Sequence, residues 1–291
     1  MNEMKIARVY DKNTETYCLV RDDRVSTKDE MISNTGIPLP LGIKEFLFEG
    51  WFEEIVNKNV DLPYATKLSD VNLLAPIPNP PKIICLAFNY MDHAKEQGKV
   101  IPKDPVPVIK PRTALCGSGN HIELVNPIKD LDYEVELALV IGETCKNANL
   151  IEAKNAIFGY MIFNDVSARD IQLQDTQFTR AKGFDTFAPC GPWITTADEI
   201  ENPDNLSLKT RVNGELRQNS STSMMGVKPY KVVSKLSSAM TLEKGDIIST
   251  GTPAGVASGS KKFGYLRGGD VIHMEIEKLG HISNTVKDLR S

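Results

Sequence analysis

The sequence lacks any long apolar run and any clear leader segment. No stretch approaches the roughly 20 apolar residues that a membrane-spanning helix needs. The first residues, 1–5, lead straight into a strand-like run, without the pattern of a signal peptide. We therefore expect a cytoplasmic protein that makes no contact with a membrane.

Cysteine and excess positive charge are also scarce. The 291 residues include 5 cysteines, which are scattered, odd in number and never spaced as C-x-x-C. This usage is typical of reduced core cysteines and disfavours a disulfide framework or a zinc site. The formal net charge of -4 gives no reason to expect nucleic acid as a partner.

Several catalytic motifs are missing as well. Gly117-Ser118-Gly119 has no third glycine in register, and Gly255–Lys261 lacks the spacing of a phosphate-binding loop. No G-x-S-x-G nucleophile elbow occurs. The sequence therefore offers no support for dinucleotide binding, nucleotide hydrolysis or serine-hydrolase chemistry.

The N-terminal part has a pattern of its own. Strand signals at 5–10 and 16–21 flank a turn, and apolar spacing predicts a helix over 43–56. Four prolines follow between residues 75 and 81, where they cannot belong to a helix or a central strand. We interpret them as a linker and predict a small N-terminal α+β domain of residues 1–75, followed by a domain of residues 76–291.

After the linker the pattern is mostly β. Short apolar or alternating runs predict strands at 82–87, 135–141, 156–163, 206–212 and 271–277, and helices near 91–97, 151–155 and 230–242. Strands and helices do not alternate regularly, which disfavours a doubly wound or barrel α/β fold. The predicted class is therefore mixed α+β, predominantly β.

Three carboxylates carry most of the chemical information. Glu134 and Glu136 are two apart in an apolar strand, so their side chains share one face, and Asp165 follows another apolar run. Buried carboxylates repel each other and need a counter-charge. Oxygen ligands alone suit Mg²⁺, Mn²⁺ or Ca²⁺ rather than Zn²⁺. The alternative is an exposed strand face on which these acids, with Asp132, are hydrated.

Other segments contain residues suited to proton transfer or charge stabilisation. His93 and Glu96 are three apart on a predicted helix, so the carboxylate can orient the imidazole as a general base, unless both are surface residues. Lys182 stands among apolar and aromatic residues and is either an anion-stabilising group or a hydrated loop lysine. The glycines of Ser249–Val256 let backbone N–H groups approach a carboxylate, although ordinary loops share this composition.

Taken together and in order, these segments resemble the fumarylacetoacetate hydrolase family from about Pro81 to the C-terminus. An ordered set of motifs is far more specific than any one of them. The resembling stretches are Asn89-Tyr90-x-x-His93-x-x-Glu96, Lys110-Pro111-x-Thr113-Ala114-Leu115, Asp132–Leu137, Asn164–Asp170, Lys182–Asp185, Arg211–Gly214 and Gly251–Gly255.

The resemblance implies a mixed β-sandwich roll and a homodimer. It also implies a Mg²⁺ or Mn²⁺ site, with Ca²⁺ as an alternative in crystals, and a small 2-oxo acid as substrate. The implied residues are Glu134, Glu136 and Asp165 as metal ligands, His93 and Glu96 as a water-activating pair on a mobile lid, Lys182 facing the substrate enolate or oxyanion, and Gln172 and Thr252 as substrate contacts.

One difference from the family pattern indicates which members this chain resembles most. The vertebrate fumarylacetoacetate hydrolases carry a further acidic ligand seven residues before the catalytic histidine, where this chain has Leu86. This favours the smaller acylpyruvase and decarboxylase members. The predicted function is hydrolysis of a C–C bond in a short 2,4-dioxo acid, of the acylpyruvate or fumarylpyruvate type, through a pyruvate enolate stabilised by the metal and Lys182. The alternatives are oxaloacetate decarboxylation, 2-hydroxyhepta-2,4-diene-1,7-dioate isomerisation, and metal or ligand binding without turnover.

Overall fold

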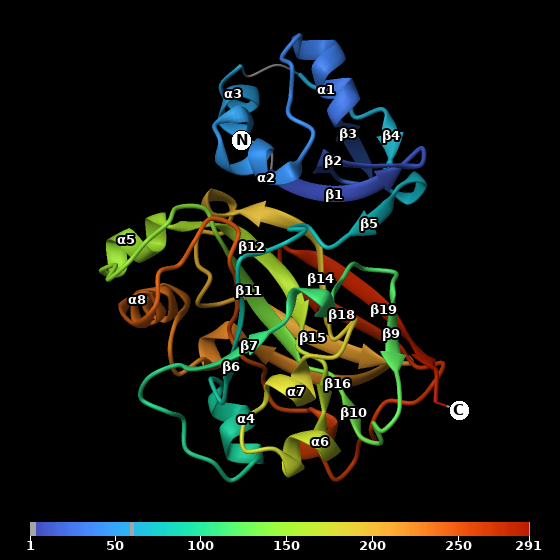
Figure 1. The fold of residues 1–291 in the computed structure, drawn as a ribbon, viewed down its shortest axis with the longest axis vertical. Coiled ribbons are helices and arrows are strands. Elements are labelled where there is room, and N and C mark those ends of the chain that lie inside the picture. The colour runs from blue at the N-terminus through green and yellow to red at the C-terminus, as the bar shows by residue number, and fades with distance from the viewer. Residues whose placement is uncertain (1–3, 59–60, 291) are drawn as a thin grey trace.

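The computed structural model describes residues 4–58 and 61–290, and Figure 1 shows the N-terminal part above the rest of the molecule. Strands β1 (Lys5–Asp11), β2 (Thr14–Arg21) and β3 (Arg24–Thr27) pair antiparallel in chain order. Lys12 and Asn13 have φ values of 45° and 64°. Positive φ at both central residues is the geometry of a tight hairpin, so the predicted turn is confirmed.

The predicted helix over 43–56 is wrong, because the structure divides it. After α1 (Lys28–Thr35) come α2 (Ile43–Phe48) and α3 (Trp51–Asn57). Gly50 separates them with a φ of 90°, a left-handed conformation that a right-handed helix cannot include. The apolar residues are still buried, as Phe46 and Phe52 show.

A large mixed sheet runs through the whole chain. Twelve of the strands in the described residues form it, in the order β4-β3-β2-β1-β14-β12-β11-β17-β6-β7, with β5 on β1 and β8 on β14. Its further members are β4 (Thr66–Lys67), β5 (Asn72–Leu74), β6 (Ile83–Ala87), β7 (Val106–Lys110), β8 (Leu115–Cys116), β11 (Val135–Ile141), β12 (Ile157–Asn164), β14 (Ala188–Thr196) and β17 (Ile247–Ser249). Because β1 pairs with β14, the sheet crosses the proposed domain boundary at residue 75. The division into two domains stays a prediction.

A smaller sheet packs against the large one. It has the order β16-β15-β18-β19-β9. Its strands are β9 (His121–Leu124), β15 (Ser207–Val212), β16 (Glu215–Ser221), β18 (Val271–Ile276) and β19 (Gly280–Asp288). Contacts of β11 with β15, β12 with β18 and β14 with β19 place the two sheets face to face. The mixed, predominantly β class is confirmed.

The remaining elements lie around these sheets. They are the short pair β10 (Leu131–Asp132) and β13 (Ser167–Ala168), and helices α4 (Met91–Glu96), α5 (Leu150–Asn155), α6 (Arg169–Gln174), α7 (Thr179–Lys182) and α8 (Pro229–Ala239). Helices α4, α6 and α7 gather at the lower end in Figure 1. Among the described helices, none is long and apolar enough to cross a membrane. All five cysteines are free.

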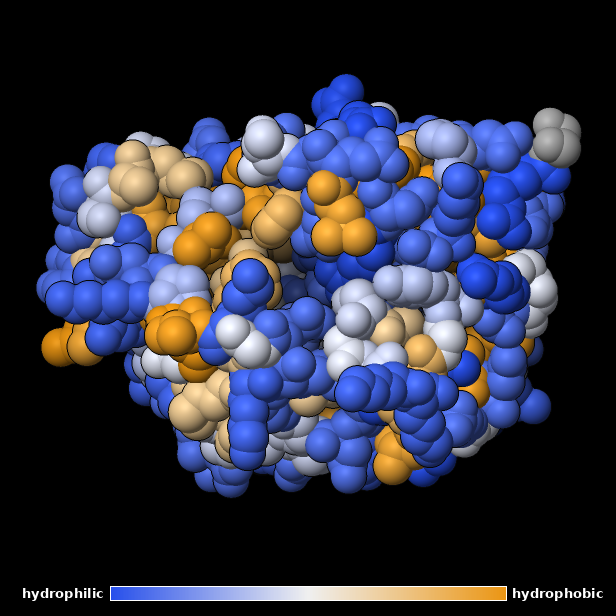
Figure 2. Space-filling view, turned by 90° about the horizontal axis from the view of Figure 1, so that it is seen from below, coloured by the Kyte–Doolittle hydropathy of each residue, from blue (hydrophilic) through white to orange (hydrophobic). Residues whose placement is uncertain are grey.

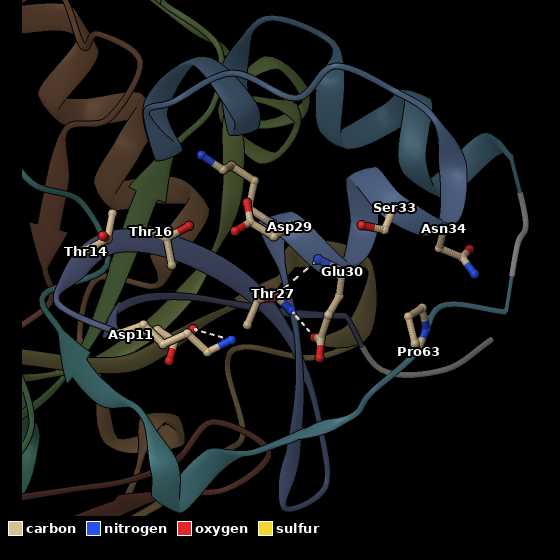
Figure 3. A pocket seen from close by; sticks show the side chains of 11 residues that line it. Asp11, Thr14, Thr16, Thr27, Asp29, Glu30, Ser33, Asn34 and Pro63 are labelled. Carbon is tan, nitrogen blue, oxygen red and sulfur yellow. Dashed lines mark hydrogen bonds and ion pairs between the residues drawn. The ribbon is translucent and has the colours of Figure 1, made fainter.

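An open hollow of about 500 Å³ lies in the N-terminal part and is drawn in Figure 3. Thr27 and Glu30 line it, but they are bonded to each other. The N–H of Glu30 donates to Oγ1 of Thr27 at 3.4 Å, and the N–H of Thr27 donates to Oε2 of Glu30 at 2.7 Å. This is the capping box of α1, so these two polar groups have a structural role.

Candidate active site

The three predicted carboxylates meet where β11 begins and β12 ends. Glu134 directly precedes β11, Glu136 is its second residue, and Asp165 directly follows β12. Val135 pairs with Asn164, so antiparallel register brings the two strand ends together. One oxygen from each carboxylate lies within 4.8 Å of those of the other two, and all three residues are buried.

Buried cations contact these acids. Nζ of Lys182 donates to Glu134 at 2.7 Å and to Asp165 at 2.6 Å, and Nζ of Lys110 donates to Asp165 at 2.5 Å. Nη2 of Arg169 donates to Glu134 at 2.5 Å. Sequence reasoning left open a hydrated loop lysine at position 182, but this side chain is 6% exposed.

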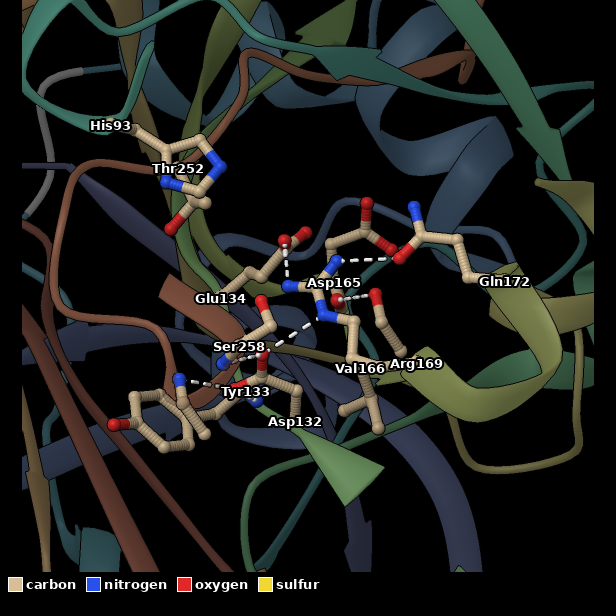
Figure 4. Close-up of polar contacts among 12 residues, drawn as sticks. His93, Asp132, Tyr133, Glu134, Asp165, Val166, Arg169, Gln172, Thr252 and Ser258 are labelled. Carbon is tan, nitrogen blue, oxygen red and sulfur yellow. Dashed lines mark hydrogen bonds and ion pairs between the residues drawn. The ribbon is translucent and has the colours of Figure 1, made fainter. Parts of the chain in front are cut away.

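Arg169 links the carboxylate cluster to two further groups. Its guanidinium donates to Asp132 at 2.9 Å, to Gln172 at 2.9 Å and to Glu134, as the dashed lines in Figure 4 show. Asp132 also accepts the N–H groups of Ala257 and Ser258, at 2.8 and 3.0 Å. Arg169 therefore connects α6, the start of β11 and the segment that follows β17.

The charges of the buried side chains in and around the carboxylate cluster do not balance. The four buried carboxylates of Asp132, Glu134, Glu136 and Asp165 face the three buried cations of Lys110, Arg169 and Lys182, which leaves one excess negative charge. A bound dication would reverse this excess and make the site attractive to an anion. The oxygen-only donor set also suits Mg²⁺ or Mn²⁺, so the residues present fit such an ion.

The two glutamates have opposite pKa shifts. Burial alone would raise the pKa of Glu134, but Arg169 and Lys182 outweigh it and lower the pKa to about 2. Burial raises the pKa of Glu136 well above its usual value, and the negative charges of Asp165 and Glu134 add to the shift. The two glutamates therefore differ because cations neighbour Glu134, whereas other carboxylates neighbour Glu136.

Glu136 is held by the segment after β17. Its Oε2 accepts the hydroxyl of Ser249 at 2.6 Å and the N–H of Gly251 at 2.8 Å. A loop N–H therefore does approach a carboxylate, as the glycine pattern indicated. The carboxylate is the protein's own and not that of a ligand.

His93 and Glu96 lie on α4, beside the same segment. Nδ1 of His93 is 3.4 Å from Oε2 of Glu96, and the imidazole is only 8% exposed. Both oxygens of Glu96 accept the N–H of Gly255, at 3.1 and 3.2 Å. The buried histidine is thus not a surface residue, while the mobility of a lid stays a prediction.

Most of the predicted site residues line one small cavity. Its lining is Leu86, Ala87, Phe88, His93, Glu134, Glu136, Arg169, Gln172, Phe178, Lys182 and Thr252. Of the predicted site residues, Glu96 and Asp165 are not part of this lining. The cavity volume is about 30 Å³. Figure 2 shows that the lower face of the molecule is largely hydrophilic and hollowed near its centre.

Residues 82–287 match the family model described as Fumarylacetoacetate (FAA) hydrolase C-terminal. The chain belongs to this family. Oxaloacetate tautomerase YisK of Bacillus subtilis is 43% identical over 223 residues, which cover 75% of this chain and 74% of that protein.

Solved structures of family members agree along almost the whole chain. Fumarylacetoacetate hydrolase (EaFAH) from Exiguobacterium antarcticum is 36% identical, with a TM-score of 0.84 over 98% of this chain and 99% of that one. A 2-hydroxyhepta-2,4-diene-1,7-dioate isomerase from Mycobacterium marinum is 33% identical, with a TM-score of 0.77 over 98% and 99%. The predicted family is confirmed, and membership indicates an enzyme that acts on ketoacids.

Sequence reasoning assigned no role to Lys110, Asp132 or Arg169, although each stands in a stretch that resembles the family. All three are buried and bonded to the cluster. The sequence did offer one signal for these residues, a charged residue within or beside a short apolar run. Lys110, for example, is the last residue of β7. That signal indicates burial but does not identify the partner.

Proposed function

We propose that this family member is a divalent-metal-dependent enzyme that interconverts the enol and keto forms of a short 2-oxo diacid of the oxaloacetate type. The observation that carries the proposal is the buried cluster of Glu134, Glu136 and Asp165 with Lys182 in contact with two of them. The name of the Bacillus subtilis relative supports oxaloacetate as the substrate.

The carboxylate cluster would hold Mg²⁺ or Mn²⁺. When bound, such an ion supplies positive charge that stabilises negative charge on a 2-oxo oxygen. Lys182 would add a second positive charge. Burial by itself would lower the pKa of Lys182, but Asp165 and Glu134 outweigh it and raise the pKa, so the ammonium persists at neutral pH.

His93 is the group suited to moving the proton. Its Nδ1 faces Glu96, which leaves Nε2 for a proton at C3 of the substrate. Gln172 and Thr252 line the same cavity and would orient the carboxylates of the diacid. In the enol-to-keto direction, tautomerisation then needs only one proton taken from the 2-hydroxyl oxygen and one given to C3, with no bond between carbon atoms broken.

The hydrolase function predicted from the sequence is a second candidate, and the His93–Glu96 contact favours it. The same imidazole would deprotonate a water molecule that attacks the 4-carbonyl of an acylpyruvate. Decarboxylation of oxaloacetate would leave the same pyruvate enolate. The homodimer and the cytoplasmic location also remain proposals.

The test follows the ultraviolet band of enol-oxaloacetate with Mg²⁺ or Mn²⁺, and measures pyruvate separately. We expect metal-dependent loss of the enol band without stoichiometric pyruvate, and abolition by EDTA. Pyruvate released from oxaloacetate would select decarboxylation, and pyruvate plus an acid from acylpyruvates would select hydrolysis. If no substrate turns over with either ion, the enzyme proposal is rejected.

His93→Ala tests the assigned proton carrier. We expect its turnover to fall by roughly 10²–10⁴-fold, the usual contribution of general acid–base catalysis. The matched control is His281→Ala, since His281 is an exposed histidine of β19 outside the cavity. Unchanged turnover in the His93 variant would remove this residue from the mechanism.

A further inference from the structure

A buried glutamine of the smaller sheet is bonded to the segment that carries Thr252. Gln218 lies in β16 and is fully buried. Its Nε2 donates to Oγ1 of Thr252 at 2.9 Å and to the carbonyl oxygen of Pro253 at 3.0 Å. Its Oε1 accepts the N–H of Val135 at 3.1 Å and the hydroxyl of Thr210 at 2.8 Å. One side chain thus joins the two sheets and the active-site segment.

These partners determine which end of the amide is which. The carbonyl of Pro253 can only accept a hydrogen bond, and the N–H of Val135 can only donate one. The NH₂ group of Gln218 must therefore face Pro253 and Thr252, and its oxygen must face Val135. A flipped amide would place its oxygen against the carbonyl oxygen of Pro253, and its NH₂ group against the N–H of Val135.

The same bonds decide where the hydroxyl proton of Thr252 goes. Because Gln218 donates to Oγ1 of Thr252, that oxygen acts as an acceptor there. Its single proton is directed to the carbonyl oxygen of Val135, at 3.0 Å. A hydroxyl has one proton to donate, so this one has none left for an anion in the cavity.

The backbone N–H of Thr252, unlike its hydroxyl, is not bonded to an acceptor in the described residues. Thr252 lines the cavity, and within residues 4–58 and 61–290 no acceptor is bonded to its N–H. The next residue, Pro253, has no N–H at all. Of this segment, only Thr252 is in the described lining of the cavity, so its N–H is the donor best placed for a carboxylate there.

We infer that Gln218 is a positioning residue of the active site, and that Thr252 contacts a substrate carboxylate through its backbone N–H and not through its hydroxyl. This rests on the proposed function only for the identity of the ligand. Through Val135, which stands between Glu134 and Glu136, Gln218 also fixes the start of the strand that carries two cluster carboxylates.

The first experiment compares Gln218→Glu with Asn219→Asp, which makes the same chemical change at the next, exposed position of β16. A carboxylate at position 218 would face the carbonyl of Pro253 and take the hydroxyl proton of Thr252. We expect KM for oxaloacetate to rise about tenfold or more, with a smaller change in kcat, while Asn219→Asp stays like wild type. Hydrogen exchange in residues 251–257 should be faster in Gln218→Glu alone.

The second experiment is a double-mutant cycle with oxalate, a dicarboxylate that needs no turnover, titrated calorimetrically into the Mg²⁺-loaded protein. We expect Thr252→Val and Gln218→Met each to bind about tenfold more weakly. The double variant should bind no more than about threefold more weakly than Gln218→Met, since both changes loosen one bonded unit.

The outcomes separate this inference from the proposed function. If Thr252→Val weakens binding by the same factor in both backgrounds, the hydroxyl contacts the ligand directly and the inference fails. Wild-type exchange and KM in Gln218→Glu would also overturn it, as would a wild-type protein that does not bind oxalate. If oxaloacetate is not turned over but exchange and oxalate binding change as expected, only the proposed function fails.

Discussion

Glu134 and Glu136 are the same residue type two positions apart, yet their surroundings shift their pKa values in opposite directions. Glu134 is lowered from 4.5 to about 2, so its contribution to stability is present above pH 4.5 and is lost as the pH falls toward 2. Glu136 is raised, so its contribution is complete below pH 4.5 and is lost as the pH rises through its folded-state pKa.

This difference predicts that metal binding releases a proton. Glu136 must lose its proton to bind an ion, and a glutamate of ordinary pKa would already be ionised at about pH 5.5. We expect Mn²⁺ titrated into metal-free protein at that pH to release about one proton per ion. Calorimetry in two buffers of different ionisation enthalpy measures it, and binding heats that agree in both buffers would contradict it.

Among the connecting segments, the one after β17 matters most to the site. It carries Thr252, and its Gly255 has a φ of 100°. A Cβ at Gly255 would overlap the backbone oxygen of Arg217, which is not a flexible side-chain end. The N–H of Gly255 also holds Glu96, so this segment and α4 depend on each other.

We therefore predict that Gly255→Ala is strongly disruptive. Strain at a left-handed position together with a backbone overlap should cost about 2 kcal/mol or more. This lowers the melting temperature by roughly 4 °C or more. Gly264→Ala is the matched control, because a Cβ there meets nothing within 4 Å and it should shift stability by under about 0.5 kcal/mol. Equal melting curves for the two variants would refute the predicted strain.

For the molecule as a whole, ion binding should stabilise the fold, because the ligands come together only in the folded state. Glu134 and Glu136 flank one end of β11, and Asp165 follows its neighbour β12. An ion at about 100 times its Kd contributes about 2.7 kcal/mol, which raises the melting temperature by roughly 5–10 °C. We expect Mg²⁺ or Mn²⁺ to give such a shift in thermal unfolding.

Asp165→Asn provides the comparison. It keeps the shape of the side chain but removes one ligand charge, so we expect the metal-dependent shift to be lost while the metal-free protein still folds cooperatively. EDTA should return the wild-type protein to its metal-free melting temperature. A variant that gains the full shift would show that the ion binds elsewhere.

The sequence by itself determined the local features of this protein. Alternation along a strand placed Glu134 and Glu136 on one face, and the three-residue spacing placed His93 beside Glu96, because the backbone period decides which side chains share a side. The ordered motifs indicated the family. The helix over 43–56 was the local failure, since apolar spacing does not reveal that Gly50 takes a left-handed conformation.

Only the tertiary structure decided which distant charges and amides meet. Lys110 from β7 reaches Asp165 at the end of β12, and Arg169 from α6 and Gln218 from the smaller sheet reach the start of β11. Periodicity reports which face of an element is buried, but the order of strands in two packed sheets selects the partners. The direction in which the Thr252 hydroxyl donates its proton depends on such a partner. Gln218, on the smaller sheet, donates to the hydroxyl oxygen and leaves the proton to the carbonyl of Val135.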